Sequence, residues 1–196
     1  MNEKEILKEF EAAQAILKGH FILSSGLHSD TYLQCARVLM DPKRAEKLCS
    51  TLADKIRKQL PKEKFDLVFS PAMGGVVVGY EMGRQLGIPS IFCERVDGKF
   101  EIRRGFSFAK GARILVVEDV VTTGKSSMEA VKCAEEAGGK VVAEASLINR
   151  SNQDSPLPFP LVSLIKLDVK TYAENEIPKD LAKIPAEKPG SRWLQK

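Results

Sequence analysis

From residue 65 onward, continuous apolar runs alternate with segments whose apolar residues recur at helical spacing. Runs without polar alternation are typical of strands buried on both faces of a parallel sheet. Strands that alternate with helices predict an α/β doubly wound parallel sheet with right-handed crossovers. The expected strands are 65–70, 89–93, 113–117, 141–148 and 161–167, and the expected helices between them are about 75–86 and 126–137.

The first 60 residues follow a different pattern. Apolar residues at helical spacing predict a helix over 3–18 that Gly19 would end. Two short strands, 21–23 and 31–33, flank a turn-like Ser-Ser-Gly segment, and a second helix should begin at Pro42 and run to about residue 60.

The tail beyond residue 169 is rich in proline and predicts an irregular surface arm. We therefore expect one domain over 1–196, with a core at about 60–170. A small N-terminal hood, mainly 1–40, would include the C-terminal segment.

Composition fits this picture of one globular domain. The 196 residues are 43% hydrophobic and 29% charged, ordinary values for such a protein. A net charge of +4 is mild and gives no indication of a nucleic-acid partner. No apolar run reaches the roughly 18 residues of a membrane span, and Met1–Lys8 lacks a secretory signal, so we expect a cytoplasmic location and no membrane partner.

The four cysteines form no CxxC pair and have no metal-type spacing with histidine. We expect free thiols in a reducing compartment with a purely packing role. They are Cys35, Cys49, Cys93 and Cys133.

The strongest chemical signal follows the apolar run that begins at residue 113. This run ends in two carboxylates, Glu118 and Asp119, and a loop rich in Thr, Gly and Ser leads into a helix. Backbone N–H groups of such a loop and the helix N-terminus favour an anion, and Gly124 would let the backbone approach it closely. The arrangement lies at the carboxyl end of a strand, where open α/β sheets bind ligands.

Two other readings of this segment exist. Gly124-Lys125-Ser126 matches the end of a P-loop, but the P-loop spacing requires glycine at position 119, which is Asp119. An acidic helix cap at a strand end is the plain structural alternative. Acids beside an anion cradle suit sugar hydroxyls or a bridging metal ion, and ribose phosphate meets both requirements.

This motif resembles the 5-phosphoribosyl 1-pyrophosphate (PRPP) site of type I phosphoribosyltransferases, and the resemblance covers roughly residues 10–150. It implies that the two acids hold the ribose hydroxyls and that the following loop holds the 5-phosphate. The residues so implied are Glu118, Asp119, Val120, Val121, Thr122, Thr123, Gly124, Lys125 and Ser126.

Two further segments match the same family. Ser70–Gly75 is similar to its pyrophosphate loop, with Met73 and Gly74 as contacts, although Gly-Gly turns are also common without a ligand. The charged segment 94–105 predicts a mobile hairpin, and in the family a loop here brings cations to the pyrophosphate. The candidate catalytic residues are therefore Arg95 and Lys99 together with Asp119; a solvated hairpin is the alternative.

The stretch 19–34 is similar to the hood of orotate phosphoribosyltransferases, and Arg150 matches their orotate-contacting arginine. A guanidinium suits the orotate carboxylate, and Ser24 and Thr122 are implied as further orotate contacts. Two departures stand out. Ser24 replaces a frequent lysine, and the hairpin lacks a Lys-x-His pair, which leaves Arg103 and Arg104 as further candidates for the loop cation.

The resemblance implies transfer of ribose 5-phosphate from PRPP to orotate in pyrimidine biosynthesis. It also implies Mg²⁺ held mainly by PRPP, with Asp119 as a further candidate ligand, and a homodimer with shared active sites. A purine-type phosphoribosyltransferase and a non-catalytic PRPP-binding regulator are the alternatives.

Overall fold

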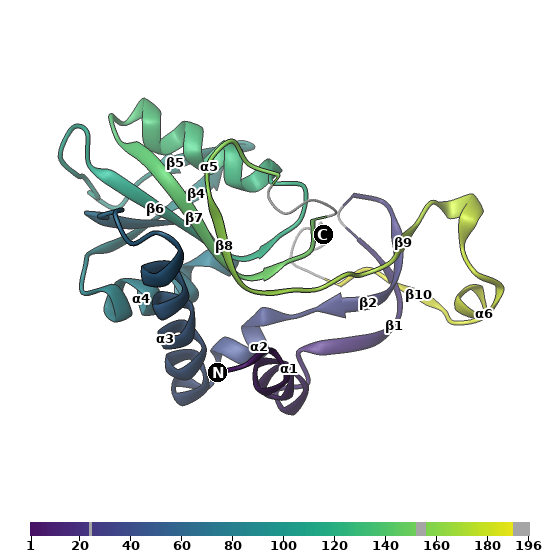
Figure 1. The fold of residues 1–196 in the computed structure, drawn as a ribbon. Helices are drawn as coiled ribbons and strands as arrows, with labels where there is room; N and C mark the ends of the chain where they lie inside the picture. The colour runs from purple at the N-terminus through teal and green to yellow at the C-terminus, as the bar shows by residue number, and fades with distance from the viewer. Residues whose placement is uncertain (24, 152–155, 190–196) are drawn as a thin grey trace.

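The computed structural model describes residues 1–23, 25–151 and 156–189 (Figure 1). In these residues a six-stranded sheet has the order β5-β4-β3-β6-β7-β8, and all its pairs are parallel except β4 with β5. Its strands are β3 (Leu67–Pro71), β4 (Ser90–Val96), β5 (Lys99–Ile102), β6 (Arg113–Val121), β7 (Lys140–Asn149) and β8 (Leu161–Lys166).

Helices cover both faces of this sheet (Figure 1). Helices α3 (Pro42–Gln59) and α4 (Gly74–Leu86) pack on one face, and α5 (Lys125–Glu136) packs on the other. Along β6, Leu115 and Val117 pack in the first cluster and Ile114 and Val116 in the second, all with no exposed area. Burial on both faces is what the continuous apolar runs predicted, and the doubly wound parallel sheet is confirmed.

The order of the strands fixes where a ligand can bind. Counted along the chain, the five parallel strands have the spatial order 2-1-3-4-5. In this order the crossovers leave β3 in opposite directions, which opens a crevice beyond the carboxyl ends of β3 and β6. The candidate segments after both strands therefore lie at one edge.

A second, smaller sheet has the order β10-β1-β2-β9 and joins the two ends of the chain (Figure 1). Its elements and the neighbouring short helices are β1 (Ile16–Ile22), β2 (His28–Leu33), α2 (Cys35–Leu39), β9 (Thr171–Tyr172), η1 (Glu174–Glu176), α6 (Lys179–Ala182) and β10 (Ala186–Glu187).

Two sequence expectations are wrong in this region. The first helix is α1 (Glu3–Ala12), because a turn with Gln14 at φ 51° ends it early and residues 16–18 enter β1. Gly19 lies inside β1, near a register shift between Lys18 and Phe21. The tail is not an irregular arm either, since β9 pairs with β2 and β10 pairs with β1. Within the described residues, no helix is long and apolar enough to cross a membrane.

A buried carboxyl lies between β7 and α5. Glu144 has no exposed area, and its Oε1 accepts a hydrogen bond of 2.7 Å from Ser127 Oγ. No partner for its Oε2 exists among the described residues. Burial disfavours the charged form and raises the pKa of Glu144 from 4.5 to about 7, against the lowering effect of the Ser127 hydrogen bond.

This carboxyl should make the fold less stable as the pH rises. Below pH 4.5 Glu144 is neutral in both states, whereas between 4.5 and about 7 the unfolded chain releases the proton first and stability falls. The variant Glu144→Gln, which stays neutral, should gain up to roughly 3 kcal/mol above pH 7 and nothing at pH 4. Urea unfolding across this pH range, with the exposed Glu135→Gln as control, tests it; parallel pH profiles for Glu144→Gln and the wild type would contradict it.

Candidate active site

The turn after β3 lies against the end of β6. A Cβ atom added at Gly74 would lie 2.8 Å from Asp119 Oδ1 and 2.9 Å from Oδ2. Only glycine fits beside this carboxylate without a shift of one of them. The turn also contains a cis peptide bond between Ala72 and Met73, and the Met73 side chain is 80% exposed. The structure thus brings Met73, Gly74 and Asp119 together, as the strand order requires.

The two acids of the motif have different surroundings. Burial raises the pKa of Asp119, although its Oδ1 accepts a hydrogen bond of 2.9 Å from its neighbour Val120 N–H. Glu118 is the adjacent strand residue, so it points to the other face of the sheet, where its charge contributes to raising the pKa of Cys93. Asp119 is therefore the acid directed at the Gly74 turn, and joint contact of both acids with one ribose stays a prediction.

The loop after β6 ends at the N-terminus of α5. Gly124 is the N-cap residue at φ 75°, and its carbonyl accepts from Met128 N–H at 2.9 Å. Thr122 and Thr123 are exposed, and Thr123 Oγ1 accepts from Lys125 N–H at 3.4 Å. Free N–H groups at a helix start and exposed hydroxyls together suit an anion.

The remaining residues of the motif differ in what they can offer. Ser126 is half-buried in the first turn of α5, and Val120 packs against the core beside Asp119. Val121 is 1% exposed within β6. The two valines can therefore contribute backbone groups to the site, and Ser126 can also contribute its hydroxyl.

The small sheet and the segment after β7 contribute a polar cluster on the same edge. Arg150 follows β7, its N–H donates to Val121 O at 2.8 Å, and its Nε is buried without a partner among the described residues. Burial lowers the pKa of Arg150, and burial followed by the charge of Asp119 raises the pKa of Tyr32. Cys35 Sγ lies 4.0 Å from Asp119 O. Asp119, Tyr32, Cys35 and Arg150 therefore surround one place.

Sequence reasoning did not name Tyr32 or Cys35 as site residues. An aromatic residue in a β-strand carries no signal that it will meet an arginine 118 positions later along the printed sequence. The ring of Tyr32 also lies beside Phe21, with ring centroids 5.7 Å apart. Ser24 lies outside the described residues.

The segment 94–105 forms the hairpin that the sequence predicts, and its mobility stays a prediction. Its strands β4 and β5 pair from Cys93↔Ile102 to Val96↔Lys99, and the turn uses Asp97 and Gly98 at positive φ. Phe100 and Ile102 pack against the core beneath α5, and this apolar contact holds the hairpin in place.

The four cations of the hairpin are not equivalent. Arg95 forms an ion pair of 2.5 Å with Glu129 on α5 and lies over the Phe100 ring at 4.1 Å. Arg104 pairs with Glu94 at 2.7 Å. Lys99 and Arg103 are exposed and have no carboxylate partner among the described residues. Lys99 and Arg103 can therefore meet an incoming anion without first breaking an ion pair.

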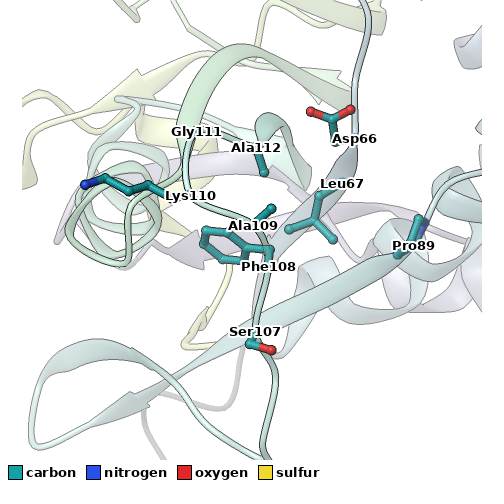
Figure 2. A pocket seen from close by; sticks show the side chains of 9 residues that line it. All are labelled: Asp66, Leu67, Pro89, Ser107, Phe108, Ala109, Lys110, Gly111 and Ala112. Atoms are coloured by element: carbon teal, nitrogen blue, oxygen red, sulfur yellow. The ribbon is translucent and has the colours of Figure 1, made fainter.

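A pocket of about 520 Å³ opens at the opposite edge of the sheet, between the starts of β3 and β6 (Figure 2). Its carboxylate, Asp66, already accepts from Arg113 N–H at 2.8 Å, and Lys110 extends away from the other lining side chains (Figure 2). The amino ends of the strands are not where such sheets bind ligands. Within the described residues, no group of three or more His, Cys, Asp or Glu side chains could hold a metal ion.

Residues 39–178 match the family of the phosphoribosyl transferase domain. Over 192 residues the chain is 56% identical to an orotate phosphoribosyltransferase of Rhizorhabdus wittichii, which covers 98% of this chain and 97% of that protein. It is 53% identical to the orotate phosphoribosyltransferase of Erythrobacter litoralis, over 98% and 99%.

Solved structures show the same architecture. Orotate phosphoribosyltransferase from Aeropyrum pernix superposes with a TM-score of 0.69 and 25% identity, over 83% of this chain and 93% of that chain. Adenine phosphoribosyltransferase from Saccharomyces cerevisiae gives 0.65 with 16% identity, over 83% and 99%, which is a likeness of fold alone.

The loop geometry predicts that a side chain at Gly124 disturbs anion binding. An alanine there would be strained by about 1–2 kcal/mol at φ 75°, and its Cβ would lie 2.9 Å from Leu157 Cδ2. Gly124→Ala should therefore weaken binding of inorganic phosphate by roughly tenfold or more, since the N–H groups would leave their convergent positions.

Gly111→Ala is the matched control, because Gly111 has φ 78° with nothing within 4 Å of an added Cβ and lies at the opposite edge. Phosphate titration by calorimetry distinguishes the two variants. Equal phosphate affinity in folded Gly124→Ala and wild-type protein would show that the anion binds elsewhere.

Proposed function

Because the chain belongs to the phosphoribosyltransferase family, among the orotate phosphoribosyltransferases, we propose that it joins orotate to the ribose 5-phosphate of PRPP and releases pyrophosphate. The product is orotidine 5′-monophosphate, and the reaction is a step of pyrimidine biosynthesis. The observation that carries the proposal for the PRPP site is the contact of Gly74 with the Asp119 carboxylate, beside the N-terminus of α5.

Different residues at this edge are proposed to bind different parts of PRPP. The loop Thr122–Ser126 takes the 5-phosphate, because hydroxyls and helix N–H groups converge there. Asp119 accepts hydrogen bonds from the ribose hydroxyls, and Glu118 is proposed to assist it. The Met73–Gly74 turn offers backbone groups to the pyrophosphate. Held this way, the anomeric carbon is fixed for in-line displacement, which needs no covalent nucleophile from the protein.

The base is recognised from the hood side. The buried Arg150 Nε has no partner among the described residues, and a buried guanidinium donor without a partner is costly. The orotate carboxylate supplies an acceptor of matching charge and planar geometry. Tyr32 would lie against the base, while Ser24 and Thr122 stay proposed contacts. A purine carries no carboxylate, so this feature favours orotate over the purine-type alternative.

The residues fit a magnesium ion that is held mainly by the substrate. Asp119 is one carboxylate at the Gly74 turn, and Mg²⁺ is usually bound by one or two carboxylates together with substrate phosphates. When bound, the ion would neutralise charge that builds on the pyrophosphate. Asp119 is the residue proposed to hold it from the protein side.

We propose that two copies of the chain form a homodimer with shared active sites. Met73, the N-cap residue of α4, and Val77 and Tyr80 within it are 80%, 50% and 70% exposed, and their helical spacing gives one apolar face. Such a face on a globular protein favours a partner surface, and this one begins at the pyrophosphate turn. A hairpin from the partner subunit could then reach the neighbouring site.

The remaining partner proposals follow from the chemistry. The substrates are small anions, and we propose a cytoplasmic enzyme without nucleic-acid or membrane partners. A regulator that binds PRPP without catalysis would need no exposed cation near the leaving group. Lys99, an exposed cation of the hairpin, is proposed to fill that role.

Truncation of Arg150 should affect the two substrates unequally. Arg150→Ala should raise the KM for orotate by the equivalent of roughly 2–4 kcal/mol, because the orotate carboxylate loses its charged partner. The KM for PRPP should change far less. Arg57→Ala, an exposed arginine on α3, is the control. Steady-state kinetics decide it, and equal increases in both KM values would indicate a general structural role instead.

Lys99→Ala should lower kcat with little effect on orotate binding, because the cation contacts the leaving group mainly near the transition state. Lys110→Ala, an exposed lysine at the opposite edge, should leave kcat unchanged. The choice of Lys99 over Arg95 rests on the Arg95–Glu129 ion pair.

Mixed dimers test whether the partner supplies the hairpin. Co-expressed Lys99→Ala and Asp119→Asn chains with two different tags should regain about half of the wild-type activity, since one of the two sites is then free of both changes. Verified mixed dimers without recovery, when each variant alone is inactive, would place hairpin and cradle of one site in the same chain.

A further inference from the structure

Two cysteines that are distant in the sequence lie in contact beneath the hairpin. Cys93 on β4 is fully buried, and Cys133 on α5 is partly exposed. Cys133 packs against the apolar cluster that contains Cys93, and the two thiols lie close enough to shift each other's pKa, with Ile102 N–H acting on Cys133 as well. The Cys93 thiol also lies 3.8 Å from Ser70 O. Because Ile102 is the β5 partner of Cys93, Cys133 lies directly over this cross-strand pair.

The surroundings make Cys133 the reactive thiol of the pair. The hydrogen bond from Cys93 lowers the pKa of Cys133 below that of a free thiol, despite partial burial. The same hydrogen bond, followed by burial, raises the pKa of Cys93. Burial also raises the pKa of Cys35, and raises that of Cys49 to about 12. Of the four cysteines, an oxidant should reach Cys133 first, with Cys93 as its nearest thiol.

We propose that Cys93 and Cys133 are a redox-sensitive pair that forms a reversible disulfide under peroxide and locks the hairpin to α5. The Cys133 thiolate attacks hydrogen peroxide and becomes a sulfenic acid, with the loss of hydroxide, which is protonated to water. The Cys93 sulfur then attacks the Cys133 sulfur, and the second oxygen leaves as water with the Cys93 proton. Two thiols lose two electrons and one peroxide gains them; a dithiol reductant reverses the change.

The location of the pair gives the disulfide a consequence for turnover. Arg95 and Glu129 already connect the hairpin to α5 by an ion pair that can open. A covalent bond one turn further along α5 removes that freedom. If the hairpin has to move over the leaving group, the locked enzyme turns over slowly. This consequence rests on the proposed function, whereas formation of the disulfide does not.

The experiment treats the full-length protein with hydrogen peroxide and follows thiols, mass and activity together. The free thiol count should fall from four to two, and the mass should drop by about 2 Da for the loss of two hydrogens. Peptide mapping should identify a Cys93–Cys133 link. The kcat should fall by roughly tenfold or more and return on treatment with dithiothreitol.

Three cysteine variants test the role of each thiol in the peroxide experiment. Cys133→Ser should keep its activity under peroxide, and Cys49→Ala, at a cysteine in α3, should respond like the wild type. Cys93→Ala should trap Cys133 as a sulfenic acid, which dimedone detects. The first oxidation step can then be observed without disulfide formation. Peroxide treatment that yields no Cys93–Cys133 link in the wild type overturns the proposal.

A disulfide that forms without any change in kcat overturns the locking of the hairpin. If the untreated protein has no transferase activity at all, the mapped disulfide still decides the redox proposal by itself. A failure of the proposed function and a failure of the redox pair are therefore distinguishable.

Discussion

The contact between the ends of β3 and β6 is the constraint on which the site depends. A Cβ at Gly74 would lie within 3 Å of both Asp119 carboxylate oxygens. The two strands are neighbours in the sheet, so the turn after one and the acid at the end of the other meet without any long-range side-chain network. The proposed anion cradle, ribose acceptor and pyrophosphate turn thereby lie at one edge.

The face of the sheet that carries α5 holds two ionisable side chains with raised pKa values, Glu144 through burial and Cys93 through Cys133 and burial. Glu144 accepts from Ser127 in the first turn of α5, and Cys93 lies where the charge of Glu118 reaches it. Burial penalises each charged form. Glu144 and Cys93 each interact with a residue of α5. The N-terminus of the same helix is the proposed phosphate site.

Much of the fold could be predicted from the sequence, because apolar runs and helical spacing report burial directly. The pattern failed where tertiary pairing decides the outcome. Residues 16–18 continue a helical spacing, yet Leu17 pairs with Tyr32 in a sheet. The tail has no strand signal, yet Ile184 O accepts from His20 Nδ1–H at 2.9 Å, which leaves His20 Nε2 to accept from His28 at 2.7 Å. The sequence around His20 and His28 gives no signal that predicts this hydrogen-bonded connection.

In the site, too, contiguous motifs could be predicted from the sequence, whereas contacts between residues far apart in the sequence could not. The motif at Glu118–Ser126 is contiguous, so its residue types and spacing could indicate an anion and a sugar. The approach of Arg150 to Tyr32, and of Cys133 to Cys93, depends on strand order and on which face each residue takes. The hairpin is the clearest example. Its charges and glycines predicted a mobile hairpin, but not that Phe100 and Ile102 pack against the apolar cluster beneath α5. An ordered hairpin with Lys99 free of any described ion pair needs only a change of position, not of folding, to bring that cation to a leaving group.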